Sequence, residues 1–201
     1  MSLLIALFLI FPVSVGAEQS EALTPADGAD FEQAVAALNQ NVSDLSKQPG
    51  AANSNRTVVF SERSLNGYLR FQGKSLLPTG LSNVSIEIQE GGRLIGTGML
   101  NLDEIGDFPG GSTGALKFLS GSLPVSITVG VEETDKRLHF TLEVVQIGPV
   151  TLPSTLAGLL VRRYSVSGRY PDGFDVSAPA LLPSAVQDIH IQQGRISIVT
   201  Q

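Results

Sequence analysis

Residues 123–148, LPVSITVGVEETDKRLHFTLEVVQIG, restrict the possible folds more than any other stretch of this chain. Apolar and polar side chains alternate along both arms, and a Glu-Thr-Asp-Lys turn joins the arms. One side of the first arm carries Val125, Ile127, Val129 and Val131, and one side of the return arm carries Leu138, Phe140, Leu142 and Val144, opposite His139, Thr141 and Glu143. Such alternation predicts an antiparallel hairpin with one buried face.

A second predicted strand, RLIGTGMLNL at 93–102, has two glycines on its apolar side. Every second residue from Leu94 gives Leu94, Gly96, Gly98, Leu100 and Leu102. Glycine in mid-strand weakens a sheet and usually marks a bend, a bulge or the close approach of another group. The space beside Gly96 and Gly98 therefore suits a sharply curved sheet, a closely packed helix such as 153–166, or an apolar ligand.

Two further segments have the same hairpin design. Residues 76–96 and 181–199 each begin Leu-Leu-Pro and continue with an alternating strand, a Gly-Arg turn and a second alternating strand. Either an internal duplication or the chance recurrence of a common hairpin explains the likeness.

Short amphipathic helices are predicted between the hairpins. Ser61 is a helix cap before Leu65, Tyr68 and Leu69, and Pro153 begins a helix with Leu156, Leu159, Leu160 and Tyr164 on one side. A short third helix is predicted over 111–121. Because each has one apolar stripe, we expect an α+β domain over 56–201 in which helices cover one side of an antiparallel sheet.

The N-terminal region divides into three predicted parts. An apolar run, Leu3 to Val15, precedes Val15-Gly16-Ala17, so residues 1–17 are predicted to be a signal peptide cleaved near Ala17. An uncleaved anchor is the alternative, although about 13 apolar residues fall short of the roughly 20 that span a bilayer. Residues 18–55 then form an amphipathic helix and a linker.

The predicted N-terminal helix starts with Asp30 as its cap. Its apolar stripe is Phe31, Val35, Leu38, Val42 and Leu45, and the Pro/Gly/Ser-rich residues 46–56 follow as the linker. The sequence leaves open whether this helix docks on the domain, pairs with a partner or lies free. Secretion places the mature protein in a periplasm or outside the cell, and the absence of cysteine excludes disulfides and thiolate chemistry.

The distribution of charge argues against nucleic acid as a partner. The formal net charge is -6, and residues 18–55 hold six acidic residues against Lys47 alone. The remainder is almost neutral. Its basic pairs, 136–137 and 162–163, are too small to form a basic stripe, and no aromatic residues are interleaved with them for base stacking.

No catalytic or metal-binding pattern is present. His139 and His190 lie on the polar sides of their predicted strands, and there is no Gly-x-Ser-x-Gly, HExxH or phosphate-loop motif. The acidic residues at 103, 104 and 107 do not have the spacing of a calcium loop. The residues at 170–175, YPDGFD, are read as a turn flanked by aromatic side chains. We therefore expect no enzyme activity, no cofactor and no metal.

The order of elements resembles that of secreted bacterial domains of the tubular lipid-binding (TULIP) superfamily. The likeness covers residues 57–201 and rests on the Ser61, Glu62, Leu65 and Asn66 helix motif, followed by the Leu-Pro hairpin, the SGSLPVSITVGVE hairpin, the Leu-Pro helix and the closing Leu-Pro hairpin. The resemblance implies a strongly curved antiparallel sheet of hairpins, wrapped around or covered by short helices. It also implies an apolar groove for lipid.

Together these observations predict a periplasmic or extracellular protein that holds or transfers a hydrophobic ligand, such as a cell-envelope lipid. The ligand-binding residues are predicted to be Leu94, Gly96, Gly98, Leu100, Val129, Phe140, Leu142, Leu156, Leu160 and Tyr164. Membrane contact would be peripheral at most. The alternative is a non-catalytic envelope scaffold with a solid core, which uses its N-terminal helix or a sheet edge to engage a protein partner.

Overall fold

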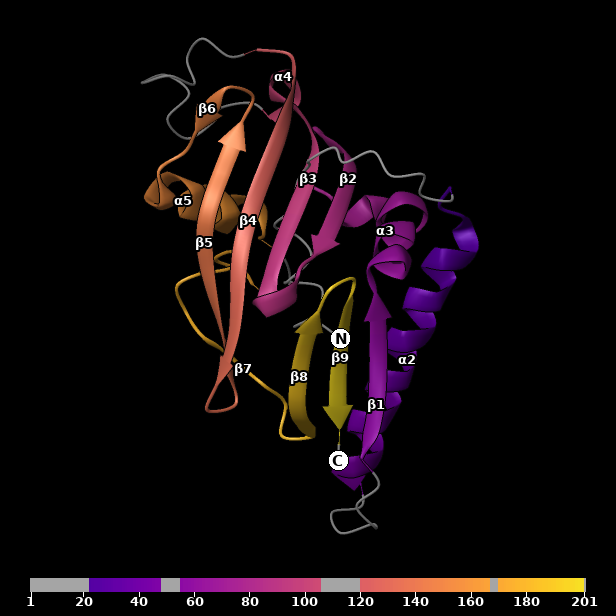
Figure 1. Cartoon of the computed structure of the whole chain (residues 1–201). Coiled ribbons are helices and arrows are strands. Elements are labelled where there is room, and N and C mark those ends of the chain that lie inside the picture. The colour runs from indigo at the N-terminus through magenta and orange to yellow at the C-terminus, as the bar shows by residue number, and fades with distance from the viewer. Residues whose placement is uncertain (1–21, 48–54, 106–119, 167–169, 201) are drawn as a thin grey trace.

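The computed structural model describes residues 22–47, 55–105, 120–166 and 170–200, which form an α+β fold with two antiparallel sheets (Figure 1). The larger sheet has the order β2-β3-β4-β5-β6, with β7 also paired to β5, and the smaller has the order β1-β9-β8. The predicted signal peptide and all but the last two residues of the helix predicted over 111–121 lie outside the described residues.

The elements have the following bounds. The strands are β1 Arg56–Ser61, β2 Leu81–Ile88, β3 Arg93–Asn101, β4 Ser122–Thr134, β5 Arg137–Ile147, β6 Val150–Thr151, β7 Ala180–Leu181, β8 Val186–Gln192 and β9 Arg195–Thr200. The α-helices of the described ranges are α2 Pro25–Lys47, α3 Glu62–Phe71, α4 Leu102–Ile105 and α5 Ser154–Tyr164, with short 3-10 turns at Gly73–Leu76 and Glu90–Gly92.

The β4–β5 hairpin is confirmed, with one correction. Asp135 and Lys136 form its two-residue turn with φ of 54° and 60°, the left-handed conformation that tight hairpins require. Farther along, Val129 pairs with Leu142 but Thr128 pairs with Val144, so β5 contains a bulge. The extra residue reverses the alternation. Val144, predicted to face the core, is therefore 45% exposed.

The two similar hairpins both form, but in different sheets. β2–β3 belongs to the larger sheet and β8–β9 to the smaller. Their turns meet, because the Gly194 amide donates to the Ile88 carbonyl at 2.8 Å and the Glu62 amide donates to the Gly194 carbonyl at 2.8 Å. Backbone hydrogen bonds thus join the two sheets at the start of α3.

The glycines and the family resemblance predicted a strongly curved sheet. This prediction is wrong, because neither sheet is strongly curled. The β3–β4 register runs without a shift from Arg93 to Asn101. Gly98 instead lies beside an irregular part of β2 between Ser82 and Ser85, where Asn83 has a φ of 52°. The chain encloses its core with two sheets and helices, so no single sheet has to close around it.

Helix α3 covers the edge strand of the larger sheet. Ser61 caps the helix as predicted, accepting a hydrogen bond from the Ser64 amide. The Asn66 side chain donates to the Ile86 carbonyl at 2.8 Å and accepts from the Ile86 amide at 2.7 Å, while a Glu62 carboxylate oxygen accepts from the Ile88 amide at 2.7 Å. These side chains form hydrogen bonds with backbone groups of β2 that would otherwise be free to pair with another strand.

Helix α2 docks on the domain and begins earlier than predicted. It starts at Pro25, not after Asp30, because proline suits the first helical position and Thr24 lies before it. The Thr24 amide donates to the Asp27 carboxylate at 2.6 Å, an arrangement like a capping box. Farther along, Phe31 is only 2% exposed and belongs to the main core.

The buried apolar residues form two clusters. The main one lies between the two sheets, α2 and α3, and the second lies between α5 and the upper part of the larger sheet (Figure 1). In α5, Leu156 and Leu160 pack against the second cluster. Leu159, predicted to share their side, is 59% exposed. The spacing of four between Leu156 and Leu160 defines the buried stripe, and Leu159 is rotated away from it.

Candidate functional site

Of the ten residues predicted to bind ligand, seven lie in β3, β4 and β5 of the larger sheet and three lie in α5, and the apolar side chains among them divide between the two clusters. Leu94, Val129 and Phe140 are in the main cluster, while Leu100, Leu156 and Leu160 pack against the second. Leu142 packs against both clusters, and Gly96 and Gly98 are buried in β3 between them. Their role as ligand contacts stays a prediction.

Tyr164, the last residue of α5, is the only one of the ten predicted residues with a polar side chain. The residue is half-buried, but its hydroxyl group is buried and has no hydrogen-bond partner among the described residues. Burial raises the pKa of this phenol, so it stays a neutral donor at physiological pH.

An apolar cavity of about 100 Å³ lies elsewhere, between α2, the smaller sheet and the β4–β5 hairpin. None of the ten predicted residues lines it. Its lining is Val35, Leu38, Asn39 and Val42 from α2, Val131 and Leu138 from the hairpin, Leu182 and Pro183 after β7, Val186, Ile189 and Ile191 from β8, and Ile196 and Ile198 from β9. Asn39 carries the only polar side chain among the lining residues.

The sequence contains every wall of this cavity but not their assembly. The stripe Val35, Leu38, Val42 was predicted as one face of a helix, and the alternation in 186–198 as one face of a hairpin. Each pattern says that a face is buried, but neither says against what. The two faces meet because α2 packs beside β1 and reaches β9 (Figure 1). The sequence indicated only that the helix and the hairpin each had an apolar face, without indicating which surface covers it.

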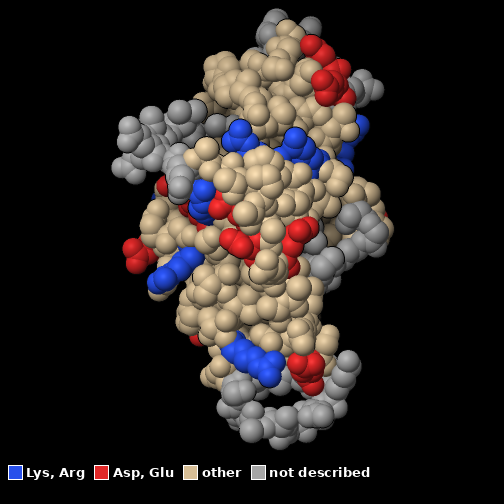
Figure 2. Space-filling view, turned by 90° about the vertical axis from the view of Figure 1, so that its right-hand side faces the viewer, with Lys and Arg blue, Asp and Glu red and all other residues tan. Residues whose placement is uncertain are grey.

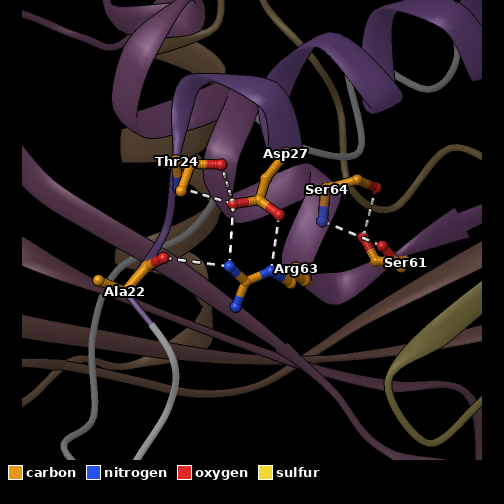
Figure 3. A network of polar contacts seen from close by, with 6 residues as sticks. All are labelled: Ala22, Thr24, Asp27, Ser61, Arg63 and Ser64. Carbon is orange, nitrogen blue, oxygen red and sulfur yellow. Dashed lines mark hydrogen bonds and ion pairs between the residues drawn. The ribbon is translucent and has the colours of Figure 1, made fainter.

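The first turn of α2 is held to α3 by a polar clamp (Figure 3). Arg63 donates through Nε to Asp27 Oδ1 at 2.6 Å and through Nη2 to Asp27 Oδ2 at 3.1 Å, and Nη2 also reaches the Ala22 carbonyl at 3.1 Å. The hydrogen bond from the Thr24 amide, followed by that from Arg63, lowers the pKa of Asp27. A two-pronged pair of this kind positions both partners as well as attracting them.

The same turn of α2 crosses α3 at close range. A Cβ added at Gly67 would lie 2.6 Å from Asp27 Cβ and 2.7 Å from the Gly28 amide nitrogen. Phe31 then packs against Phe60 and Tyr68, with ring centroids 5.5 Å and 4.8 Å apart. The N-terminal half of α2 is therefore fixed by tight contacts with α3 and β1.

The C-terminal half of α2 covers the cavity and is attached differently. Val35, Leu38 and Val42 face the cavity. Beyond them, Arg56 of β1 donates to Asn41 Oδ1 at 3.0 Å and lies 3.6 Å from Asp44 Oδ2. Both members of the Arg56–Asp44 pair are 52% exposed, so solvent weakens their attraction. This half is a roof, held by apolar contacts and by the polar contacts of Arg56.

The charged side chains of the described residues lie outside the cavity lining. No group of three or more His, Asp or Glu side chains within the described ranges could hold a metal ion. His190 lies 3.4 Å from Asp188 on the exposed surface. On the face seen in Figure 2, the side of α2, positive and negative side chains are interspersed and neither sign dominates the described part.

The YPDGFD segment has a structural role in this fold. Gly173 has a φ of 81° and its amide donates to the Tyr170 carbonyl, so the predicted turn is confirmed. Phe174 is buried and makes edge contacts with Phe140 and Tyr170 at centroid distances of 5.5 and 5.4 Å. Asp175 accepts hydrogen bonds from Ser177, which lower the pKa of its carboxyl group.

In comparisons with known proteins, no family model, no curated protein and no solved structure matches this chain. In addition, none of the helices in the described ranges is both long enough and apolar enough to cross a bilayer.

Proposed function

We propose that this chain is a non-catalytic protein that binds a hydrophobic ligand, a cell-envelope lipid or a similar molecule, and that the cavity beneath α2 takes an apolar part of it. The observation that supports this proposal is an unfilled space whose walls are aliphatic except for one amide. Apolar cavities of this kind tend to stay dry and accept apolar guests.

The size of the cavity limits what it can enclose. Its volume of about 100 Å³ is about two thirds of that of an engineered apolar cavity of about 150 Å³ that binds benzene, which corresponds to roughly four carbon atoms. At about 0.8 kcal/mol per buried CH₂ group, such a unit gains about 3–4 kcal/mol, which corresponds to millimolar affinity at best. A longer lipid would be held at one end here and would need further contacts outside the cavity.

A tryptophan scan tests the site. Leu38→Trp, or Val35→Trp as a second variant, places a large ring at the roof of the cavity. Leu159→Trp makes the same change on exposed α5 and serves as the control. We expect the affinity of the roof variants for 1-hexanol to fall at least tenfold, while the control binds it as the native protein does. Binding is measured from the NMR chemical shifts of the α2 amides. Equal binding by all variants that remain folded would refute the cavity as the site.

Native mass spectrometry of the protein purified from its own host tests the ligand class. An apolar adduct that is present in the native protein and depleted in Leu38→Trp supports lipid binding. The same cavity is also large enough for one apolar side chain of a partner protein, which favours the scaffold as the second candidate. Absence of any lipid adduct, together with no response to hexanol, would favour that alternative.

A further inference from the structure

The cavity beneath α2 carries information on the polarity of its ligand, provided that the function proposed above is correct. Its lining has no cation and no anion, and its only polar side chain is the Asn39 amide. Asn39 is half-buried, and its side chain makes no hydrogen bond within the described structure. An amide donor and acceptor is therefore available at a wall that is otherwise aliphatic.

Acidic and basic residues both lie close in sequence to the lining, Arg137 and Arg195 among them, but none lines the cavity, so an anion finds no positive partner among the described lining residues. Helix α2 itself carries Asp30, Glu32 and Asp44, and Glu132 and Glu133 follow the lining residue Val131. Among basic residues, Lys136 is exposed and donates to the Gln187 carbonyl, while Arg56 contacts Asn41 and Asp44. A carboxylate drawn toward the cavity would lose water without gaining a positive partner, which is strongly unfavourable.

A cation would face a related penalty. Asn39 can accept at most two hydrogen bonds through its carbonyl oxygen, whereas an ammonium group has three donors to satisfy. The acidic residues named above do not line the cavity, so they do not replace the lost hydration. A neutral oxygen group, in contrast, matches a single amide that both donates and accepts.

We infer that the ligand group entering this cavity is uncharged: a short or branched aliphatic unit ending in one neutral oxygen function, such as an alcohol or an ester, which hydrogen-bonds to Asn39. The aliphatic part contacts the roof and the strands of the smaller sheet. This ligand class differs from free fatty acids and from alkylamines, which have similar tails.

A matched series of six-carbon ligands tests the inference. 1-Hexanol, hexanoate and hexylammonium are each titrated at pH 7 into the isotope-labelled protein. The NMR chemical shifts of the α2, β8 and β9 amides are followed. Hexanol is expected to bind at least tenfold more tightly than either charged ligand. Equal or tighter binding of hexanoate or hexylammonium would overturn the inference while leaving the proposed function intact.

Two variants assign the selectivity to Asn39. Asn39→Leu removes the amide from the cavity wall, and we expect a threefold to tenfold loss of hexanol affinity with little change for pentane. Gln40→Leu removes an amide from the exposed neighbouring position and should change neither. If both variants affect hexanol equally, Asn39 is not the contact. If no ligand of the series, pentane included, shifts any α2 amide, the proposed function itself fails.

Discussion

The two halves of α2 lie on the same body but are held by different forces. In the N-terminal half, a charged clamp, a close helix crossing and a buried ring hold the helix against α3 and β1. In the C-terminal half, apolar side chains cover a cavity of about 100 Å³, and Arg56 supplies polar contacts at the far end. One half therefore anchors the helix, and the other can serve as the movable wall of a site.

The largest difference between the two halves should appear when a core contact is removed from each. Phe31→Ala deletes a ring that is 2% exposed, and we expect a loss of about 3–5 kcal/mol in the free energy of unfolding. Leu38→Ala removes a half-buried side chain that already lacks neighbours on its cavity side, so about 1 kcal/mol is expected. Urea unfolding measures both. Equal losses would mean that the two halves are packed alike.

The second prediction concerns the helix crossing. Gly67→Ala places a methyl group 2.7 Å from a backbone nitrogen and 2.6 Å from the Cβ atom of Asp27, so α2 must shift, and a loss of about 1–3 kcal/mol is expected. Gly28→Ala is the matched control. The atoms nearest to its methyl group belong to the end of the Gln72 side chain, which can move at the loss of an exposed hydrogen bond to the Pro25 carbonyl, and alanine favours the helix. If thermal unfolding shows Gly28→Ala to be less stable than Gly67→Ala, the close crossing is contradicted.

Features that depend on neighbouring residues were predictable from the sequence. Ser61 caps α3 because a hydroxyl before a helix satisfies a free amide, and the β4–β5 turn forms between two alternating arms. The buried stripe of α2 was also visible, although its start was not, because Asp30 and Thr24 are both good caps. Thr24 is the cap because Pro25 follows it and because its amide donates a hydrogen bond to Asp27.

Features that depend on distant residues were not predictable. The bulge that turns Val144 outward arises from pairing with β4, and the adjacent apolar residues Val144 and Val145 in the sequence do not decide which of the two faces the core. Gly96 and Gly98 suggested a strongly curved sheet. In the structure, Gly98 lies beside an irregularity in β2, and a second sheet helps to enclose the core. The cavity needs α2 to meet β8 and β9, which are about 150 positions away in the chain. Periodicity defines faces, whereas their pairing is a property of the whole fold.

The third prediction uses pH to weaken the anchored half alone. Hydrogen bonds from Thr24 and Arg63 lower the pKa of Asp27 below its ordinary value of 3.8. The clamp therefore contributes fully above that value, and its contribution is lost as the pH falls through the lower pKa of the folded state. Asp27→Asn should be less stable than the native protein at pH 7, and the difference should shrink toward pH 3. A difference that stays constant or grows in acid would show that the charge on Asp27 does not stabilise the fold.

The smallest effect is expected at the far end of the roof. Arg56→Gln removes an exposed ion pair and a hydrogen bond to Asn41, which together contribute about 0.5–1 kcal/mol or less to global stability. Local opening should respond more strongly, because the roof has a cavity beneath it where the anchored half has solid packing. Hydrogen exchange of the amides from Val35 to Asp44 should accelerate, while that of the anchored half stays unchanged. Arg93→Gln, which removes a pair with Glu143 on the larger sheet in which the arginine is as exposed as Arg56, is the control and should leave α2 unaffected. Acceleration along the whole of α2 would instead mean that the helix opens as one unit, and the distinction between anchor and roof would then disappear.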